Sequence, residues 1–318
     1  MIDRFAGWIV VPGRRWYTWS VTTVRRLVAA LGLSCLFLGC ASGPDDDASS
    51  EEACPQPDPP AVAGAGPPVL PEVDDAPTPY AYTVEVVDRL EHDTTAFTQG
   101  LVHADGLLYE STGHYGESDI RLVQPETAKV LLDAAMDEQF FGEGLAMHDG
   151  RLFQLTWREQ QLFVRDRCTL DELDRMDYAG EGWGLVGDGD RLWRSDGSSL
   201  LHQHDPDTFE VVGTVEVSDR GVPLARLNEL ELVDGQIMAN VFGEPWIAVI
   251  DPETGEVTAW VNCSSLVADI DVTDSGDVLN GIAVDPKSGR LWLTGKRWPI
   301  LYEVRIIPGD DLPPPGLL

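Results

Sequence analysis

Short apolar runs alternate with polar residues throughout residues 80–307, and turn signals separate the runs. The run Leu107–Glu110, for example, follows Asp105-Gly106. Asp-Gly favours the positive φ angles of a tight hairpin turn, and alternation over four to eight residues indicates a strand. No long amphipathic helical pattern occurs, and Asp171–Met176 has room for a helix of at most one or two turns. The pattern therefore predicts an all-β domain built from hairpins.

One module recurs five times: a polar or aromatic residue, a small or apolar residue, an apolar strand, a tight turn and a second strand. The aligned residues at positions 100, 144, 184, 230 and 281 are 44, 40, 46 and 51 residues apart. A period of about 40–50 residues with several short strands is typical of a β-propeller blade. We therefore predict a five-bladed β-propeller over about 80–307. The alternatives, a β-sandwich or a barrel, do not predict this period.

The first strand of each module is expected to border the central axis, so the residue before the aligned position should face the mouth of the channel. These residues are Gln99, Glu143, Trp183, Glu229 and Asn280, and the second strands end at Gly113, Trp157, Gly197, Phe242 and Lys296. Carboxylates, amides, a lysine and aromatic rings suit a small, partly polar ligand. Asn228 adjoins Glu229, and periodicity does not fix which of the two faces the ligand.

Charge narrows the classes of partner. The chain of 318 residues has 54 acidic and 22 basic side chains, a net charge of −32, and 43% hydrophobic residues, enough for a packed core. Residues 80–318 alone hold 44 acidic and 17 basic residues, a net charge of −27. This balance argues against nucleic acid and against docking on anionic lipid. We interpret it as an adaptation for solubility, and we expect a monomer.

The N-terminal region has the parts of an export signal. Arg25-Arg26 precede the apolar run 27–38, which is too short to span a bilayer at ~20 residues and ends at Gly39-Cys40. Gly39-Cys40 resembles a bacterial lipobox, in which the cysteine is diacylated, although Phe37 stands where that motif prefers Leu. We predict a signal over 1–40 with lipidation at Cys40; an ordinary cleaved signal is the alternative. The expected location is the cell envelope, lipid-anchored in the outer membrane or periplasm, or secretion.

Residues 41–79 are rich in Pro, Ala, Gly and acids and hold ten of the 22 prolines, so we predict a disordered tether between anchor and domain. In the globular part, Cys168 and Cys263 could pair in an oxidising compartment, but two cysteines carry no spacing signal, and we expect no disulfide between them. The close pair His202-x-His204 precedes an Asp-Pro turn and is interpreted as a surface loop. No arrangement of histidines typical of a zinc site occurs.

Several short motifs resemble those of one family. They are Phe97-Thr98-Gln99-Gly100-Leu101, Glu110-Ser111-Thr112-Gly113, Phe141-Gly142-Glu143-Gly144, Leu155-Thr156-Trp157-Arg158, Glu181-Gly182-Trp183-Gly184, Leu227-Asn228-Glu229-Leu230, Ala239-Asn240-Val241, Leu279-Asn280-Gly281 and Leu293-Thr294-Gly295-Lys296. In this order, over about 95–305, they resemble the glutaminyl cyclases of plants and bacteria (glutamine cyclotransferases). The resemblance implies a five-bladed propeller without a cofactor. It would act on peptides or proteins with an N-terminal glutamine, converting that residue to pyroglutamate and releasing ammonia.

The resemblance also implies roles for particular residues. Glu143 would be the general acid and base, and Lys296, Asn228 and Gln99 would be polar pocket residues that bind the γ-amide or its oxyanion. The apolar walls would be Phe97, Phe141, Trp157 and Trp183. Phe242 is a departure, because many members carry Trp there; the wall keeps an aromatic ring but loses an indole donor, which Trp246 could partly replace.

Two other classes remain open from the residues alone. One is a non-catalytic envelope propeller lipoprotein that binds peptides. The other is a metal-dependent propeller hydrolase or lactonase, for which Glu143, Glu229, Asn228 and Asn280 could supply ligands. We expect no metal, and metal dependence of the activity would separate the last class from a cyclase.

Overall fold

The computed structural model describes residues 54–56, 70–71, 79–270 and 274–313. The predicted signal with Cys40, and most of the predicted tether, lie outside the described residues. The prediction of an all-β fold is confirmed, because strands dominate and the described part holds one short α-helix, α1 (Ser264–Asp269), and one 3₁₀ turn, η1 (Pro125–Thr127). No helix in these ranges is long and apolar enough to cross a membrane.

Three sheets have four strands each, and in all three the strands follow chain order and pair antiparallel. The first contains β2 (Thr98–Ala104), β3 (Leu107–Thr112), β4 (Asp119–Gln124) and β5 (Lys129–Ala135). The second contains β6 (Gly142–His148), β7 (Arg151–Thr156), β8 (Gln161–Asp166) and β9 (Glu172–Asp177). The third contains β10 (Leu185–Gly187), β11 (Leu192–Ser195), β12 (Leu200–His204) and β13 (Val211–Glu216).

The largest sheet has eight strands in the order β16-β17-β18-β19-β1-β22-β21-β20. They are β16 (Leu227–Val233), β17 (Gln236–Val241), β18 (Trp246–Ile250), β19 (Val257–Asn262), β1 (Tyr80–Glu91), β22 (Ile300–Pro308), β21 (Leu291–Gly295) and β20 (Leu279–Val284). All neighbours are antiparallel except β19 and β1, which pair in parallel. A two-stranded ribbon, β14 (Ser218–Asp219) and β15 (Val222–Pro223), completes the described strands.

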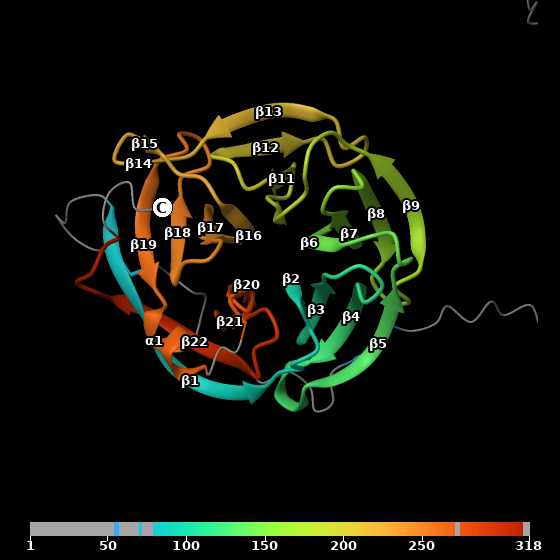
Figure 1. The fold of residues 1–318 in the computed structure, drawn as a ribbon, viewed down its shortest axis with the longest axis horizontal. Helices are drawn as coiled ribbons and strands as arrows, with labels where there is room; N and C mark the ends of the chain where they lie inside the picture. The colour runs from blue at the N-terminus through green and yellow to red at the C-terminus, as the bar shows by residue number, and fades with distance from the viewer. Residues whose placement is uncertain (1–53, 57–69, 72–78, 271–273, 314–318) are drawn as a thin grey trace, which may run out of the picture. The chain divides into compact units, whose positions relative to one another are not determined.

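The sheets lie around a common centre, with β2, β6, β16 and β20 toward it and β5, β9 and β13 at the rim (Figure 1). Burial follows this arrangement: every residue of β3 and β20 is buried, whereas β5 and β9 have no buried residue. A strand packed on both faces can be apolar throughout, but a rim strand meets solvent on one edge and on much of its surface. The core therefore lies between neighbouring sheets.

Local sequence explains the hairpins that join the inner strands. Asp105, Asp149 and Asp234 have φ of 51°, 48° and 51°, and the glycine after each also has a positive φ. Two successive positive φ angles are those of the turn that Asp-Gly favours, so these predicted hairpins are confirmed. The segment Asp171–Met176, for which at most one or two helical turns were allowed, has no helix, because residues 172–176 belong to β9. As an exposed rim strand, β9 lacks the apolar alternation that identifies a strand.

The prediction that His202 and His204 lie in a surface loop is wrong. His202 and His204 lie in β12, and His204 is fully buried rather than in a surface loop. His204 Nδ1 donates to the carbonyl of Phe209 at 2.7 Å, and its Nε2 accepts from Arg194 Nε at 3.1 Å. Burial lowers the pKa of His204 to about 4, so the ring is neutral at physiological pH. It is a hydrogen-bonded core residue.

Two points of the N-terminal segment contact the sheets. Cys54 forms a disulfide with Cys168, 114 residues away, and Cys263 is buried and free. The expectation that Cys168 and Cys263 do not pair is therefore confirmed, but Cys168 has a partner that was not predicted from the sequence, a cysteine of the predicted tether. The N–H of Leu70 donates to Asp234 Oδ2 at 3.0 Å. At these two points, at least, the predicted tether is held against the domain.

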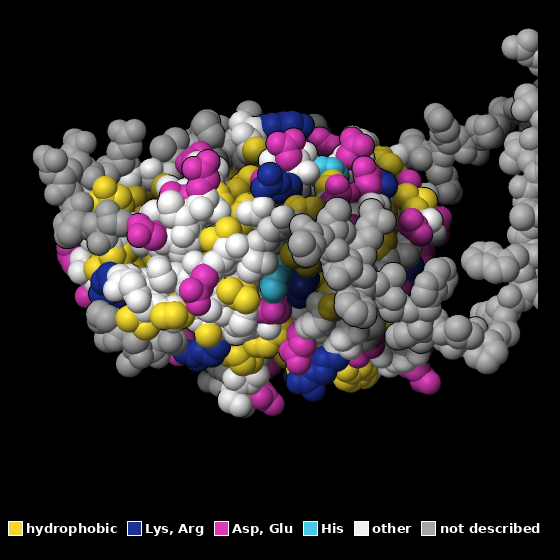
Figure 2. Space-filling model, turned by 90° about the horizontal axis from the view of Figure 1, so that it is seen from above, with side chains coloured by type: hydrophobic (Ala, Val, Ile, Leu, Met, Phe, Trp, Pro, Cys, Tyr) yellow, Lys and Arg dark blue, Asp and Glu magenta, His cyan; other side chains and the backbone are white. Residues whose placement is uncertain are grey.

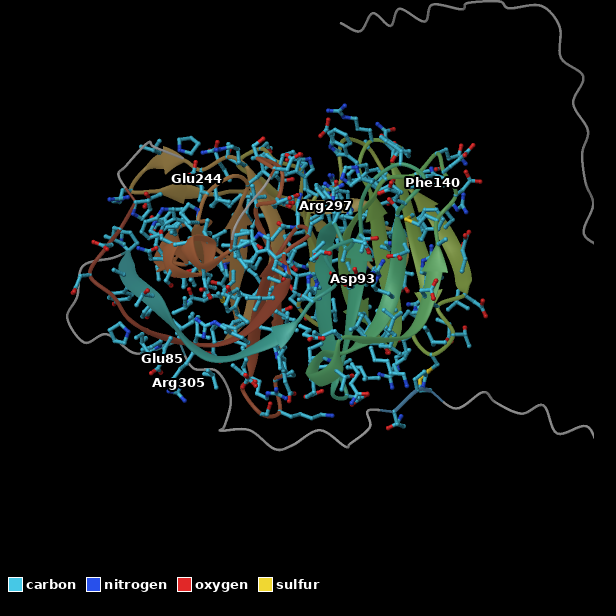
Figure 3. All side chains as sticks on the ribbon, turned by 60° about the horizontal axis from the view of Figure 1, so that its bottom comes forward. Glu85, Asp93, Phe140, Glu244, Arg297 and Arg305 are labelled. Atoms are coloured by element: carbon cyan, nitrogen blue, oxygen red, sulfur yellow. A yellow bond between two sulfur atoms is a disulfide. The ribbon has the colours of Figure 1, made fainter. Side chains whose placement is uncertain are left out.

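The disulfide lies at the end of the ring away from the starts of the inner strands. β6 runs away from those starts, β7 returns, and β8 leaves again, so the β8–β9 turn that carries Cys168 is at the far end. Figure 3 shows this sulfur–sulfur bond at the lower edge, away from Glu244 and Arg297. Figure 2 shows acidic side chains spread over the visible face with basic ones between them. Many of the acids are therefore in contact with solvent.

Candidate active site

Four inner strands carry an irregularity where they begin. The register shifts between Thr98 and Gly100 in β2, and between Gly142 and Leu145 in β6. The same shift occurs between residues 227 and 230 in β16 and between 279 and 282 in β20. A bulge breaks the alternation of a strand and redirects a side chain. Polar residues can therefore turn toward the centre there without disturbing the apolar faces beyond.

A cavity of about 230 Å³ opens at this end of the ring. It is lined by Phe97, Gln99, Phe141, Glu143, Trp157, Trp183, Asn228, Phe242 and Lys296. All nine residues predicted from the sequence to take part in catalysis or substrate binding thus line this one cavity. The residues come from all the large sheets and from the loops between their strands.

Two residues expected at the mouth do not line the cavity. Glu229 Oε2 accepts from the N–H of Ile282 at 3.0 Å, and Asn280 Nδ2 donates to the carbonyl of Thr98 at 3.0 Å. Both side chains therefore join neighbouring inner strands. The structure resolves the choice between Asn228 and Glu229 in favour of Asn228 as the cavity residue. Trp246 packs near Trp260, with ring centroids 6.4 Å apart, and does not replace the missing indole beside Phe242.

Glu143 is the acidic group of the cavity. It is 5% exposed, and Gln99 Nε2 donates to its Oε1 at 3.0 Å. Burial raises the pKa of Glu143 well above its usual range; Lys296 opposes this, and the carboxylates of Glu181 and Glu159 add to it. A carboxyl group with a raised pKa can both accept and return a proton near neutral pH. Gln99 Oε1 is buried without a partner in the described structure, so an acceptor is free for a ligand N–H.

Lys296 is the basic group. Its side chain is almost fully buried, and its Nζ lies 4.8 Å from the ring centroid of Phe97 and 5.2 Å from that of Phe242. Burial lowers the pKa of Lys296 to about 8, although Glu143 opposes the change. The ammonium is therefore charged at neutral pH and held against two aromatic faces. Such a cation can stabilise negative charge that develops on a ligand oxygen.

Aromatic rings continue around the cavity. Phe97 lies 6.2 Å from Phe141, and Phe141 lies 5.5 Å from Trp157, between ring centroids. On the other side, Trp183 and Phe242 meet edge to face at 5.7 Å. Lys296 connects Phe242 back to Phe97. We call this set of five rings the aromatic belt; it gives the cavity an apolar wall with a few polar groups inside it.

One residue of the site was not given a role from the sequence. Glu181 Oε2 accepts from the indole Nε1 of Trp157 at 2.8 Å and from that of Trp183 at 3.1 Å. It therefore bridges the gap in the aromatic belt between these two rings. The sequence places Glu181 two residues before Trp183, but its contact with Trp157 depends on how two sheets pack. The family motif Glu181-Gly182-Trp183-Gly184 contains this residue, but the motif alone does not indicate its contact with Trp157.

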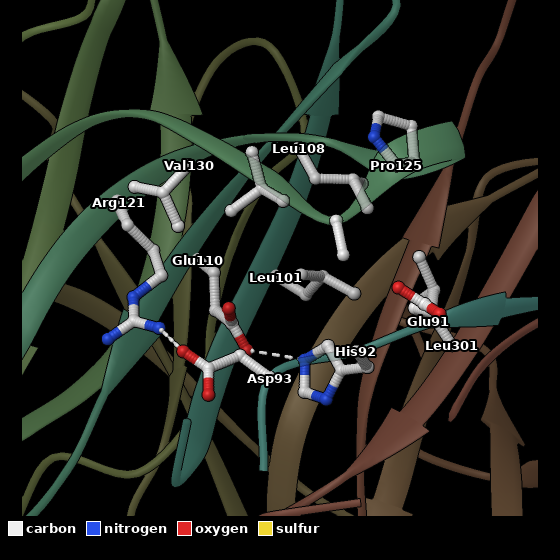
Figure 4. Close-up of a pocket in the computed structure, with 12 residues that line it drawn as sticks. Glu91, His92, Asp93, Leu101, Leu108, Glu110, Arg121, Pro125, Val130 and Leu301 are labelled. Carbon is white, nitrogen blue, oxygen red and sulfur yellow. Dashed lines mark hydrogen bonds and ion pairs between the residues drawn. The ribbon is translucent and has the colours of Figure 1, made fainter. Parts of the chain in front are cut away.

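A second, smaller cavity of about 20 Å³ lies behind β2 and β3 (Figure 4). There His92 Nε2 and Glu110 Oε1 form a buried ion pair at 3.0 Å, and Thr98 donates to the same oxygen at 2.6 Å. His92 Nδ1 donates to the carbonyl of Trp298 at 2.7 Å. The pair thus joins the strand that carries Gln99 to the loop that carries Lys296. The space is the size of a single water, so its role is structural.

Among the described residues no group of three or more His, Cys, Asp or Glu side chains is arranged to hold a metal ion.

The sequence model of the glutamine cyclotransferase family matches residues 62–306. A glutaminyl-peptide cyclotransferase of Arabidopsis thaliana is 41% identical over 229 residues, which are 70% of this chain and 71% of that protein. The crystal structure of Myxococcus xanthus glutaminyl cyclase aligns with a TM-score of 0.70 and 41% identity, covering 73% of this chain and all of that one.

Proposed function

Because the chain belongs to the glutamine cyclotransferase family, we propose that it is a glutaminyl-peptide cyclotransferase, which converts the N-terminal glutamine of peptides to pyroglutamate and releases ammonia. The resemblance seen in the sequence motifs is confirmed by these comparisons. One observation carries the proposal furthest: the nine residues that match the family's motifs surround one cavity large enough for a single amino-acid residue.

The reaction joins the α-nitrogen of glutamine to its own side-chain carbonyl carbon. The cavity walls hold the residue folded, so that the amine and the carboxamide meet. Glu143 takes a proton from the attacking amine and returns it to the departing nitrogen, which leaves as ammonia when its bond to carbon breaks. Lys296 and Asn228 bind the carboxamide oxygen as it becomes an oxyanion, and Gln99 orients Glu143.

We infer a five-bladed β-propeller as the finer description of the fold. Three four-stranded sheets supply three blades, each beginning at the centre and ending at the rim. The parallel pairing of β19 with β1 divides the eight-stranded sheet into two antiparallel sets of four, β16–β19 and β20–β22 with β1. The five repeats in the sequence agree with this division, because each supplies the first hairpin of one set.

We also propose export to the cell envelope and a lipid anchor at Cys40. The Cys54–Cys168 disulfide supports export, because such bonds persist in oxidising compartments. The charged, apolar and Gly-Cys parts of the leader support the anchor.

The test of the proposed activity is ammonia release from a dipeptide with N-terminal glutamine by the full-length protein. Glu143→Gln keeps the side-chain volume but removes the proton carrier, so kcat should fall about 10²–10⁴-fold with little change in the melting temperature. The same dipeptide with an acetylated N-terminus is the control substrate. An active Glu143→Gln variant would move the catalytic role elsewhere. Chelator-sensitive activity restored by a divalent metal would favour a metal-dependent enzyme, and peptide binding without ammonia a non-catalytic protein.

A further inference from the structure

Glu181 occupies a distinctive place beside the cavity. The aromatic belt has contacts between rings on both sides, whereas the side chains of Trp157 and Trp183 both donate to one oxygen of the Glu181 carboxylate. The two tryptophans come from different sheets, one after β7 and the other just before β10. A shared acceptor fixes the tilt of both rings at once, which neither ring contact nor backbone geometry does alone.

The other oxygen of Glu181 is also bound. Arg158 Nε donates to Glu181 Oε1 at 3.0 Å, and the Arg158 guanidinium lies over the ring of Trp157 at 3.6 Å from its centroid. The Glu181 side chain is 38% exposed, so solvent reaches it. Burial raises the pKa of Glu181, but the hydrogen bonds from Trp183, Trp157 and Arg158 outweigh this and lower it. Glu181 is therefore negatively charged across the physiological range.

We propose that Glu181 is a positioning residue of the site: its carboxylate fixes the tilt of the two tryptophans that hold the substrate, and its negative charge acts on the proton carried by Glu143. The inference rests on the proposed function, because it assigns the wall to substrate binding and Glu143 to proton transfer. It adds a residue outside the cavity lining that influences both binding and the pH dependence of catalysis.

The charged groups around Glu143 determine how Glu181 should affect the pH dependence of catalysis. Lys296 lowers the pKa of Glu143, whereas Glu181 and Glu159 raise it. Glu159 accepts from the hydroxyl of Tyr115 at 2.8 Å, and the buried Tyr178 also interacts electrostatically with Glu143. If the charge of Glu181 is removed, Glu143 ionises more easily. The acid limb of the pH profile should then move to lower pH.

Two variants of Glu181 separate the effect of its negative charge from the effect of its side-chain length. In Glu181→Gln the length is kept and the charge is lost, so we expect KM to rise about tenfold and the acid limb of kcat/KM to shift by about half a pH unit to lower pH. In Glu181→Asp the charge is kept, but a shorter side chain cannot reach both indoles. We expect a raised KM with the acid limb close to that of the wild type.

Asp188→Asn is the matched control. Asp188 Oδ2 accepts from the indole of Trp193 at 2.8 Å, the same kind of bond, but at the other end of β10. This variant can lose stability, yet KM and the pH profile should stay at wild-type values. A general structural effect of losing a carboxylate–indole bond would show itself here as well.

Binding is measured separately from turnover. In a Glu143→Gln background, tryptophan fluorescence is titrated with the dipeptide that has N-terminal glutamine, and adding Glu181→Gln should weaken binding about tenfold. An unchanged KM, acid limb and binding constant in Glu181→Gln, with an active wild type, would overturn the inference. So would equal kinetic changes in Asp188→Asn. A wild type that releases no ammonia would instead refute the proposed function.

Discussion

Replacing Lys296 with methionine is expected to make the protein more stable while nearly abolishing its activity. Lys296 is 3% exposed, and its ammonium lies against the rings of Phe97 and Phe242. Methionine is similarly long and unbranched, so it can fill the same space. The substitution removes the cost of burying a charge together with the group that stabilises the oxyanion.

The size of the gain follows from the pKa. A fall from the ordinary value of 10.5 to about 8 corresponds to about 3 kcal/mol of destabilisation at neutral pH. The variant also loses the cation–aromatic contacts, which destabilises it by about 1 kcal/mol and reduces the gain. Loss of Lys296 also raises the pKa of Glu143 further, so this carboxyl takes up a proton more readily and little extra cost of a buried charge is added. The net gain of about 2 kcal/mol should raise the melting temperature by roughly 4–8 °C.

The pH dependence has a defined direction. Below pH 8 both the folded and the unfolded chain carry the Lys296 proton, and the full cost of burial is present. Between about pH 8 and 10.5 the folded protein has lost this proton and the unfolded chain has kept it. Wild-type stability at this site therefore rises with pH, and the advantage of Lys296→Met should shrink to almost nothing near pH 10.5.

Thermal unfolding at pH 7 and pH 10, with steady-state kinetics at pH 7.5, tests the prediction. We expect kcat to fall about 10²–10³-fold, as for removal of an oxyanion donor. Lys287→Met is the control, because Lys287 is 78% exposed and its ion pair with Asp105 is at the far end of the ring. A lower melting temperature for Lys296→Met at pH 7 would refute the reasoning. It would mean that Lys296 and Glu143 stabilise each other as a buried ion pair.

The remaining predictions concern the N-terminal region. Cys54→Ser should lower the melting temperature of the oxidised protein, since a bond that closes a 114-residue separation contributes up to about 5 kcal/mol. kcat should be unchanged because the bond is remote from the cavity, and reductant should bring the wild type to the same melting temperature; a variant as stable as the oxidised wild type would contradict this. Cys40→Ala should move the protein from the membrane fraction to the soluble fraction and abolish labelling by a fatty-acid probe, whereas an unlabelled wild type would indicate a simply cleaved signal.

Local chemistry in the sequence was sufficient for the hairpins and for most of the site. Asp-Gly at 105–106, 149–150 and 234–235 predicts turns whose dihedral angles depend on those two residues alone. The choice between Asn228 and Glu229 was different, because β16 has a bulge there and a bulge breaks the alternation on which the prediction depends. The motif resemblance supplied the correct residue where periodicity left both open.

Other contacts depend on packing between distant segments, and the local sequence does not indicate them. Glu181 acquires its role from the approach of Trp157 across two sheets, and Cys54 meets Cys168 because the N-terminal segment returns to the far end of the ring. The strand β9 was not predicted because its own sequence lacks a strand pattern. Its residues are mostly exposed, so no buried face imposes an apolar alternation on the sequence.

The place of β1 in the largest sheet has a consequence for how the chain reaches its native state. β1 is the first described strand, yet it pairs along most of its length with β22, the last one. The N-terminus leaves a ribosome or an export channel first. More than two hundred residues therefore follow β1 before its antiparallel partner β22 emerges. The ring can therefore close only after synthesis or translocation is complete. Until then an unpaired strand edge can pair with wrong partners, and this interval is where chaperones would act.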